Sequence, residues 1–326
     1  MEPLSQTIVI PIQDITQVSL ARRSAAAFAQ AAGLDEKRHG ALNVVLTELA
    51  NNLVQHAGGG ELYVGYLKPI GALDIAAVDH GRGMPDVERC LVDGYTTAST
   101  PGLGLGAVKR FAERFSAFSV MNRITIVSAR MAEVKPEPDF SVISTAIAGE
   151  TLSGDAWSIS EDGNTFLVAD GLGHGLLAAE AAMTAVSIFR KDPNLPLEML
   201  LERMHTAMRS TRGAAAAIAR VKPDELRLEF AGIGNISASI LGAERSQSLV
   251  SHNGTLGHQM RRVQQFSYPY RPGDMLVMHS DGLTTHTKLG LPPLLLTQSP
   301  RVVAPLLYSE QVRGRDDATI LVTRLV

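Results

Sequence analysis

The stretch Thr165-Phe-Leu-Val-Ala-Asp-Gly-Leu-Gly-His-Gly175 joins an apolar run to a glycine-rich turn, and the alanine-rich segment 176–190 follows it. The apolar run has the length and composition of a buried strand, and the segment after the turn has helical spacing. Asp170 is therefore expected at the end of a strand, where the chain turns toward a helix. A single Asp-Gly pair most often only forms a turn, so the stretch indicates chemistry only if similar positions occur elsewhere.

Three further acidic positions stand at the edges of strand candidates. They are Asp155 after Gly154, Asp281 in Ser280-Asp-Gly282, and the pair Asp316-Asp317 in Arg315-Asp-Asp-Ala-Thr319. Buried carboxylates without partners are costly, so aspartates gathered at strand ends meet water or surround cations. Mg²⁺ and Mn²⁺ favour oxygen ligands, and two such ions about 3.5–4 Å apart can bind phosphate and activate a bridging hydroxide. Four such positions favour hydrolysis of a phosphate ester over isolated turns.

The segment Ala132-Glu-Val-Lys-Pro-Glu-Pro-Asp139 is the best candidate for a linker, because its two prolines remove backbone donors and disfavour helix before them. We place one domain at 1–134, a linker at 135–139 and a second domain at 140–326. The first domain has predicted helices at 17–33, 41–56 and 105–115, with strand candidates at 61–67, 73–79 and 124–130. In the second, many strand candidates are interrupted by helices at 176–190 and 196–211. The sequence thus predicts a two-domain α+β chain.

Polar and glycine-rich segments of the first domain suit a nucleotide. Glu48 and Asn52 lie four residues apart on the helix 41–56, so both emerge from one face, where one could act as a base and the other as a metal ligand. In Asp79-His-Gly81-Arg-Gly83 the aspartate can accept from an amino group, and the glycines allow close backbone approach. The turn Gly102-Leu-Gly104-Leu-Gly106 leads into a helix whose free N–H groups favour phosphate. Each segment alone is more often a solvated face or a turn, but together they predict an ATP pocket.

The order of these segments resembles the GHKL-type ATPases, and most closely the RsbT-like anti-sigma-factor serine kinases that phosphorylate STAS-domain proteins. The resemblance covers roughly residues 5–131 and includes a lid formed by Asp93-Gly-Tyr-Thr-Thr97 with Gly102, Gly104 and Gly106. It implies an α/β sandwich that binds ATP with magnesium, with Glu48 as general base, Asn52 as magnesium ligand and Asp79 as partner of the adenine amino group. The segment 120–126 lacks the family's Gly-x-Gly-Thr, so the resemblance supports ATP binding more than kinase turnover.

The acidic positions of the second domain resemble, in order, the motifs of the SpoIIE-type branch of the metal-dependent protein phosphatases, which are protein phosphatase 2C-like, and especially its RsbX-like members. The matching motifs are Gly149-Glu-x-x-x-Gly-Asp-x-Trp157, Ala169–Gly175, Ser280-Asp-Gly282 and Arg315–Thr319. The resemblance implies an α-β-β-α sandwich with two Mn or Mg ions. The metal ligands would be Asp155, Asp170, the Gly171 carbonyl, Asp281 and Asp316, with Asp317 as an adjacent ligand or a residue behind the ligands. His174 either protonates the leaving serine oxygen or caps the following helix.

The composition argues against several other classes of protein. The formal net charge is -3 and no run of five Lys or Arg occurs, so nucleic acid is not an expected partner. The single cysteine, Cys90, cannot form an internal disulfide, and no Cys-x-x-Cys spacing suggests zinc, which fits a reducing cytoplasm. No leader-like N-terminus and no apolar segment of about 18 residues is present, so we expect a soluble protein that does not cross a membrane.

Together the two resemblances imply a cytoplasmic protein serine/threonine phosphatase, dependent on Mg or Mn, in a bacterial partner-switching stress pathway. Its expected partners are phosphorylated STAS-domain proteins, such as an anti-sigma antagonist or a stressosome-like scaffold, and a sigma or anti-sigma factor. The first domain would phosphorylate the same substrates, sense ATP or dock a partner. The alternatives are a bifunctional kinase and phosphatase, or a non-catalytic partner-switch adaptor. A histidine kinase is a further alternative for the first domain, but no helix with a phosphoacceptor histidine precedes it.

Overall fold

The computed structural model describes residues 6–91, 104–132, 138–244, 246–284 and 292–326. The chain divides into two compact units, one of Met1–Pro136 with Arg301–Ser309 and one of Glu137–Pro300 with Glu310–Val326. A single boundary at the linker does not give this division, because Arg301–Ser309 lies after the linker but belongs to the first unit. The domain limits 1–134 and 140–326 therefore stay a prediction.

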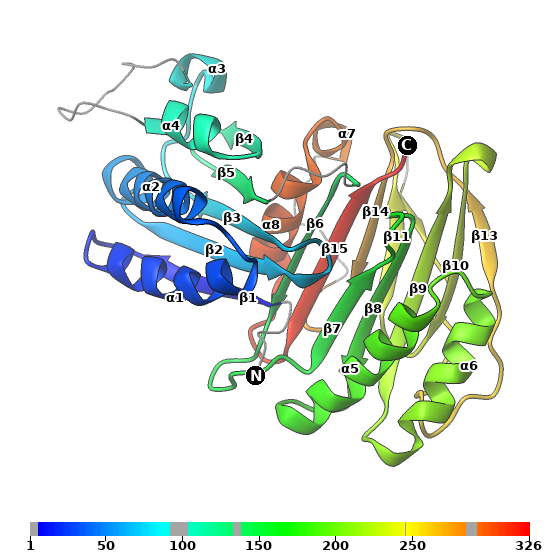
Figure 1. The fold of residues 1–326 in the computed structure, drawn as a ribbon. Helices are drawn as coiled ribbons and strands as arrows, with labels where there is room; N and C mark the ends of the chain where they lie inside the picture. Colours follow the sequence, from blue (N-terminus) through cyan, green and yellow to red (C-terminus); the bar gives the residue numbers. More distant parts are fainter. Residues whose placement is uncertain (1–5, 92–103, 133–137, 245, 285–291) are drawn as a thin grey trace. The chain divides into compact units, whose positions relative to one another are not determined.

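The first unit is built on an antiparallel sheet in the order β1-β2-β3-β5-β4 (Figure 1). The strands are β1 (Thr7–Ile12), β2 (Gly60–Leu67), β3 (Ala72–Asp79), β4 (Arg114–Val120) and β5 (Ile124–Met131). The helices are α1 (Gln17–Ala31), α2 (Glu36–Asn52), α3 (Val87–Cys90) and α4 (Gly104–Phe111), with a 3-10 turn at Lys68–Ile70. Buried residues of α1 and α2 pack on the sheet and form one core with it.

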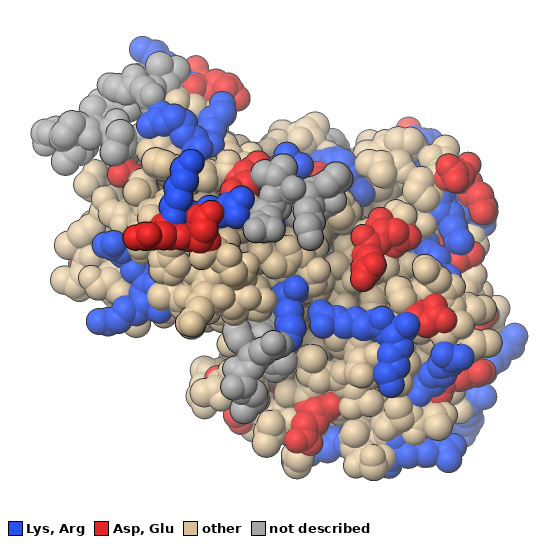
Figure 2. Space-filling view, in the orientation of Figure 1, with Lys and Arg blue, Asp and Glu red and all other residues tan. Residues whose placement is uncertain are grey.

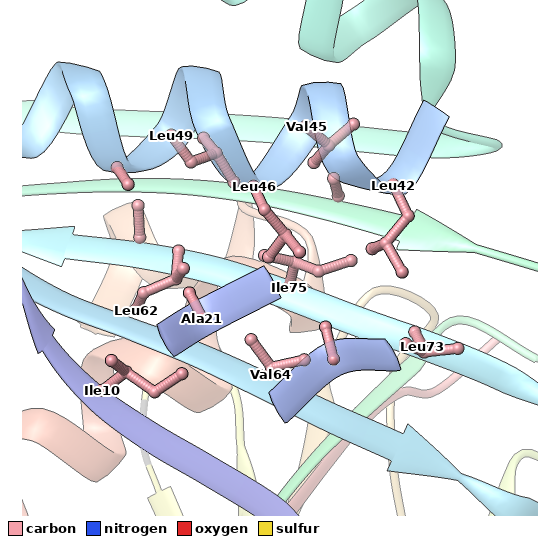
Figure 3. Packing of buried hydrophobic residues seen from close by; sticks show 14 of the residues in the cluster. Ile10, Ala21, Leu42, Val45, Leu46, Leu49, Leu62, Val64, Leu73 and Ile75 are labelled. Carbon is pink, nitrogen blue, oxygen red and sulfur yellow. The ribbon is translucent and has the colours of Figure 1, made fainter. Parts of the chain in front are cut away.

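Helix α2 positions the polar residues of this unit by burying its opposite face. Its N-cap Asp35 accepts a hydrogen bond from the N–H of Arg38 at 2.8 Å, which satisfies one free donor of the first turn. Figure 3 shows its buried stripe and the sheet residues around it, namely Leu42, Val45, Leu46 and Leu49 against Leu62 and Val64 of β2 and Leu73 and Ile75 of β3. The helix continues into a π-helical turn at Leu53–Ala57 and ends at Gly58, whose φ of 74° is left-handed.

The first unit differs from the sequence-based expectation at α4, at β4, where no strand was predicted, and at β1. The helix predicted at 105–115 ends at Phe111, because Arg114 already pairs with Arg130 in the β4–β5 ladder and the N–H of Glu113 bonds to the Arg130 carbonyl at 3.0 Å. Strand β1 was not predicted. It contains Pro11 and lies at the edge of the sheet, where proline removes no interior ladder bond.

The second unit contains two antiparallel sheets, ordered β13-β10-β9-β8-β7 and β12-β11-β14-β15-β6. The strands of the first are β7 (Asp155–Ile159), β8 (Thr165–Gly171), β9 (Ala214–Lys222), β10 (Arg227–Ile233) and β13 (Phe266–Pro269). Those of the second are β6 (Phe140–Thr145), β11 (Ser237–Leu241), β12 (Ser246–Ser248), β14 (Met275–His279) and β15 (Ala318–Arg324). The helices after the linker are α5 (Leu176–Lys191), α6 (Leu197–Ala207), α7 (Pro292–Leu296) and α8 (Pro300–Gln311), with 3-10 turns at Met208–Ser210 and Pro223–Glu225. Most of α8 belongs to the first unit.

The two sheets of the second unit pack against each other, and helices α5 and α6 cover the outer face of one of them (Figure 1). Phe140 of β6 and Trp157 of β7 bridge the sheets with ring centroids 6.2 Å apart. The alanine-rich inner face of α5 lets the helix approach the sheet closely, with Ala178, Ala182 and Ala185 all buried. Because sheets and helices are both substantial in each unit, the predicted α+β class is confirmed.

On the face shown in Figure 2, basic and acidic side chains are interspersed, in keeping with the formal net charge of -3. Of the helices that the structure describes, none is long and apolar enough to cross a membrane.

Candidate functional site

Two carboxylates meet where the β7–β8 hairpin opens. Asp155 begins β7, and its directly opposite partner in β8 is Asp170. In an antiparallel pair such partners lie only about 4.5–5.5 Å apart at Cα. The register of the hairpin therefore places the two side chains next to each other.

The second sheet brings the other predicted acidic residues to its own edge. Strand β14 ends at His279, two residues before Asp281, and pairs with β15, which begins directly after Asp316-Asp317. The Ser280 hydroxyl donates to Asp155 Oδ2 at 2.6 Å, which joins this edge to the β7–β8 hairpin. The strand ends that the sequence singled out are thus gathered at one place in the second unit.

The electrostatics of the second unit show that these carboxylates interact. Burial raises the pKa of Asp170 to about 8, and the negative charges of the other four predicted aspartates raise it as well. Burial also raises the pKa of Asp155 to about 7, against hydrogen bonds from Ser280 and Thr319 that lower it. Such a cluster favours a bound cation, because a cation removes the repulsion and lets the carboxylates ionise.

Asp155 has an oxygen that fits a metal ion. Its side chain is buried, and its Oδ1 has no hydrogen-bond partner among the described residues. A hard divalent cation would supply the missing partner, and the carboxylate-rich surroundings suit Mg²⁺ or Mn²⁺. As the side chains stand, no three His, Cys, Asp or Glu in the described part of the chain form a ready-made ion site. The carboxylates are thus chemically suited to a divalent cation, and which of them bind it stays a proposal.

Asp316 and Asp317 differ in their surroundings. Asp317 is buried, with Oδ1 accepting from the N–H of Ile147 at 2.8 Å and Oδ2 from the N–H of Gly154 at 2.7 Å. Asp316 is exposed, and its Oδ1 accepts from the N–H of Asp317 at 2.9 Å. Both carboxylate oxygens of Asp317 already accept hydrogen bonds from backbone N–H groups. This geometry favours Asp316 as the metal ligand and Asp317 as the residue that fixes the loop before Asp155.

Sequence reasoning missed Asn235. Its Nδ2 donates to Asp281 Oδ2 at 2.6 Å, which orients the Asp281 carboxylate. Asn235 lies in the turn after β10, 46 residues away from Asp281 along the chain. The only signal in the sequence was a Gly-Asn turn, which is common without any function.

The turn after Asp170 packs tightly at its glycines. A Cβ on Gly171 would lie 2.1 Å from the Ala178 carbonyl oxygen, so the first turn of α5 can reach the candidate Gly171 ligand only because that residue lacks a side chain. Gly173 and Gly175 have positive φ of 85° and 74°. Between them, His174 Nδ1 lies 2.8 Å from Oε1 of Glu150, which belongs to the motif Gly149–Trp157 but was given no role from the sequence.

The first unit places Asp79 at the end of β3, next to the glycines predicted to contact a nucleotide. The N–H of Gly81 donates to Asp79 Oδ1 at 2.9 Å, and burial raises the pKa of Asp79. A Cβ on Gly81 would lie 2.7 Å from Ala57 Cα, so only glycine fits there. Gly83 has a φ of 79°, and a Cβ on it would lie 3.0 Å from Met121 Cα. The Asp79 loop therefore packs closely against the π-helical turn that follows α2, through Gly81, and against the β4–β5 turn, through Gly83.

Glu48 of α2 contacts the first residue of α4, Gly104. Burial raises the pKa of Glu48, while a hydrogen bond from the Gly104 backbone N–H lowers it. Nearby on α2, Asn52 Nδ2 is buried without a partner among the described residues. Gly106 is buried within α4, whereas Gly102 lies outside the described residues. The predicted lid Asp93–Thr97 also lies outside them. The described residues fit a magnesium nucleotide, since Glu48 lies at the N-terminus of α4 and the Asn52 amide on the same helix face is buried without a partner among them.

The fold and the site define two classes of domain in one chain: a phosphatase domain of the protein phosphatase 2C type, and a kinase-like ATPase domain. The family model "Stage II sporulation protein E (SpoIIE)" matches residues 160–326, and the model "Histidine kinase-like ATPase domain" matches residues 13–131. The chain belongs to the SpoIIE family and carries an RsbT-related ATPase domain in its first half.

Individual relatives match the two halves separately. Phosphoserine phosphatase RsbX of Bacillus subtilis (strain 168) is 25% identical over 186 residues, which are 54% of this chain and 89% of that protein. Serine/threonine-protein kinase RsbT of the same organism is 34% identical over 90 residues, which are 27% of this chain and 68% of that protein.

Two solved structures are similar to about half of the chain. One from work on "The bacterial stressosome: a modular system that has been adapted to control secondary messenger signaling" is 28% identical with a TM-score of 0.53, covering 57% of this chain and 98% of its own. RsbX in complex with magnesium is 23% identical with a TM-score of 0.52, covering 57% and 94%. The second likeness concerns the fold alone.

Proposed function

We propose that the second unit removes phosphate from phosphoserine or phosphothreonine in STAS-domain regulators of a partner-switching pathway. The observation that carries this proposal is the gathering of five mutually repelling carboxylates at the strand ends of two sheets. The similarity to a phosphoserine phosphatase supports it. An anti-sigma antagonist or a stressosome-like scaffold is the class of substrate that these relatives suggest.

Two Mn or Mg ions would be held by Asp155, Asp170, the Gly171 carbonyl, Asp281 and Asp316. When bound, such ions neutralise the carboxylates, polarise the phosphate and activate water. The protein itself supplies the geometry. The hairpin register holds Asp155 beside Asp170, and Asn235 orients Asp281. Asp317 fixes the loop before Asp155 through two backbone N–H groups, and His174 lies on the turn that follows Asp170, where it could protonate a leaving oxygen.

For the first unit we propose binding of ATP with magnesium. Asp79 would accept from the adenine amino group, Asn52 would contact the ion, and the glycines around Asp79 would let the backbone approach the nucleotide. Phosphorylation of the same STAS-domain substrates is a second candidate function, because Glu48 is held at the N-terminus of α4 in a position suited to a general base. Binding of a sigma or anti-sigma factor without catalysis is the competing reading.

The deciding experiment uses the full chain, stripped of metal with EDTA, and a phosphorylated STAS-domain protein. Phosphate release should appear as Mn²⁺ is titrated in and should disappear again with excess EDTA. Stable binding of the phosphoprotein with no release at saturating Mn²⁺ would favour the adaptor. Kinase activity is measured separately, with ATP and Mg²⁺, in the Asp170→Asn variant, so that a phosphorylated product is not hydrolysed as it forms.

A further inference from the structure

Glu150 and His174 form a carboxylate–imidazole pair beside the acidic cluster. His174 Nδ1 and Glu150 Oε1 are 2.8 Å apart, which is hydrogen-bond distance. The His174 side chain is 60% exposed and that of Glu150 36%, so the imidazole is open to solvent on its other side while its Nδ1 is engaged. The two residues come from loops 24 positions apart in the sequence.

Both loops are tied to the candidate ligands. The N–H of Glu150 bonds to the Ile147 carbonyl at 3.1 Å, and the N–H of Ile147 bonds to Asp317. The loop of His174 begins at Asp170, and the N–H of Leu172 bonds to the Gly213 carbonyl at 3.0 Å. The pair therefore links the loop that Asp317 holds to the turn that follows Asp170.

The charged groups around His174 are mostly acidic. Glu150 contacts its Nδ1. Burial raises the pKa of Asp317 and the charge of His174 opposes that rise, which places the Asp317 carboxylate nearby. One cation opposes them, since an Nη atom of Arg212 lies 3.0 Å from the place that a Cβ on Gly173 would take. A carboxylate in contact with one ring nitrogen fixes which nitrogen carries the transferable proton.

We propose that Glu150 is a positioning residue that holds His174 as the general acid of phosphoester hydrolysis. In this arrangement Nδ1–H donates to Glu150, and Nε2–H is directed to the substrate. As water attacks phosphorus, the bond between phosphorus and the serine oxygen breaks, and the Nε2 proton passes to that oxygen. The products are a serine hydroxyl and inorganic phosphate, and the imidazole regains a proton from solvent. This inference rests on the proposed phosphatase function.

A purely structural role for Glu150 makes a different prediction. A Cβ on Gly175 would lie 3.1 Å from both Glu150 carboxylate oxygens, and Gly175 is the N-cap of α5. A carboxylate there could simply favour the helix N-terminus. Loss of such a carboxylate lowers the stability of the fold and slows the hydrolysis of every substrate equally. Loss of a positioned acid slows only a substrate whose leaving oxygen needs a proton.

The test compares two substrates of the full chain with Mn²⁺: a phosphoserine STAS-domain protein and p-nitrophenyl phosphate, whose leaving phenolate needs no proton. We expect His174→Ala to lower kcat for the phosphoprotein about 100-fold, as for loss of a general acid. We expect Glu150→Gln to lower it about 10-fold at unchanged KM, as for loss of a group that orients a catalytic histidine. Both variants should hydrolyse p-nitrophenyl phosphate like the wild type.

The double variant and a matched control complete the design. If Glu150 acts through His174, the double variant should be no slower on phosphoprotein than His174→Ala alone. Glu180→Gln removes an exposed carboxylate from α5, the helix that follows His174, and should leave hydrolysis of both substrates unchanged. Equal losses on both substrates, additive losses in the double variant, or no loss in Glu150→Gln would overturn the inference. Absence of Mn²⁺-dependent hydrolysis in the wild type would instead overturn the proposed function.

Discussion

Replacement of Asp170 by asparagine is expected to stabilise the metal-free protein while it removes phosphatase activity. Burial and the neighbouring carboxylates raise the pKa of Asp170 from 3.8 to about 8. The folded state therefore keeps a proton that the unfolded state releases, so stability falls as the pH rises from 3.8 toward 8. At about 1.4 kcal/mol per pH unit, the loss at pH 7 is about 4 kcal/mol. Asparagine does not ionise, so the variant does not suffer this loss of stability.

In EDTA at pH 7 the Asp170→Asn variant should therefore melt roughly 10 °C above the wild type, the shift that about 4 kcal/mol produces in a unit of this size. The gain should shrink at pH 5, where less of the ionisation cost is present. With Mn²⁺ the order should change, because ions that bind only the folded wild type stabilise it by mass action. Phosphate release by the variant should fall by orders of magnitude, since the charge that holds the ions is lost.

The matched control for this experiment is Asp162→Asn. Asp162 lies in the turn at the far end of the β7–β8 hairpin, where its Oδ1 accepts from the N–H of Asn164 at 3.2 Å. Its replacement should leave activity and the Mn²⁺ response unchanged. The reasoning is refuted if the Asp170→Asn variant in EDTA melts at or below the wild type, or if it stays folded and turns over at a near-wild-type rate with Mn²⁺.

Asp79→Asn should abolish the heat of ATP binding in calorimetry, because the carboxylate proposed to accept from the adenine amino group is lost; an unchanged heat would remove Asp79 from the pocket. Glu48→Gln should keep ATP affinity but suppress any phosphoryl transfer to a STAS-domain protein, and retained transfer would remove Glu48 from the base role. Asp281→Asn and Asp316→Asn should each raise the Mn²⁺ concentration needed for half-maximal phosphate release and be partly rescued by more Mn²⁺. A lowered rate with an unshifted Mn²⁺ midpoint would argue against their role as ligands.

Much of this architecture could be predicted from local patterns. The leucine stripe of α2 follows the helical period, and the apolar run before Asp170 forms β8. Both depend on interactions within one element, which a sequence window contains. The predicted end of the helix 105–115 was wrong because it depends on an interaction outside that window. Arg114 pairs with a strand that comes later in the chain, and this pairing ends the helix early.

The sequence by itself determined most of the elements around the site and the residue types available for chemistry: aspartates at strand ends, glycines in turns, and a polar face on α2. Only the tertiary structure decided which of them meet. The contact of Ser280 with Asp155 spans 125 residues, and those of Asn235 with Asp281 and of Glu150 with His174 span 46 and 24. Such contacts depend on sheet register and on close packing between distant segments. Local propensity does not encode either, because a shift of one residue in register turns a side chain to the other face of its sheet.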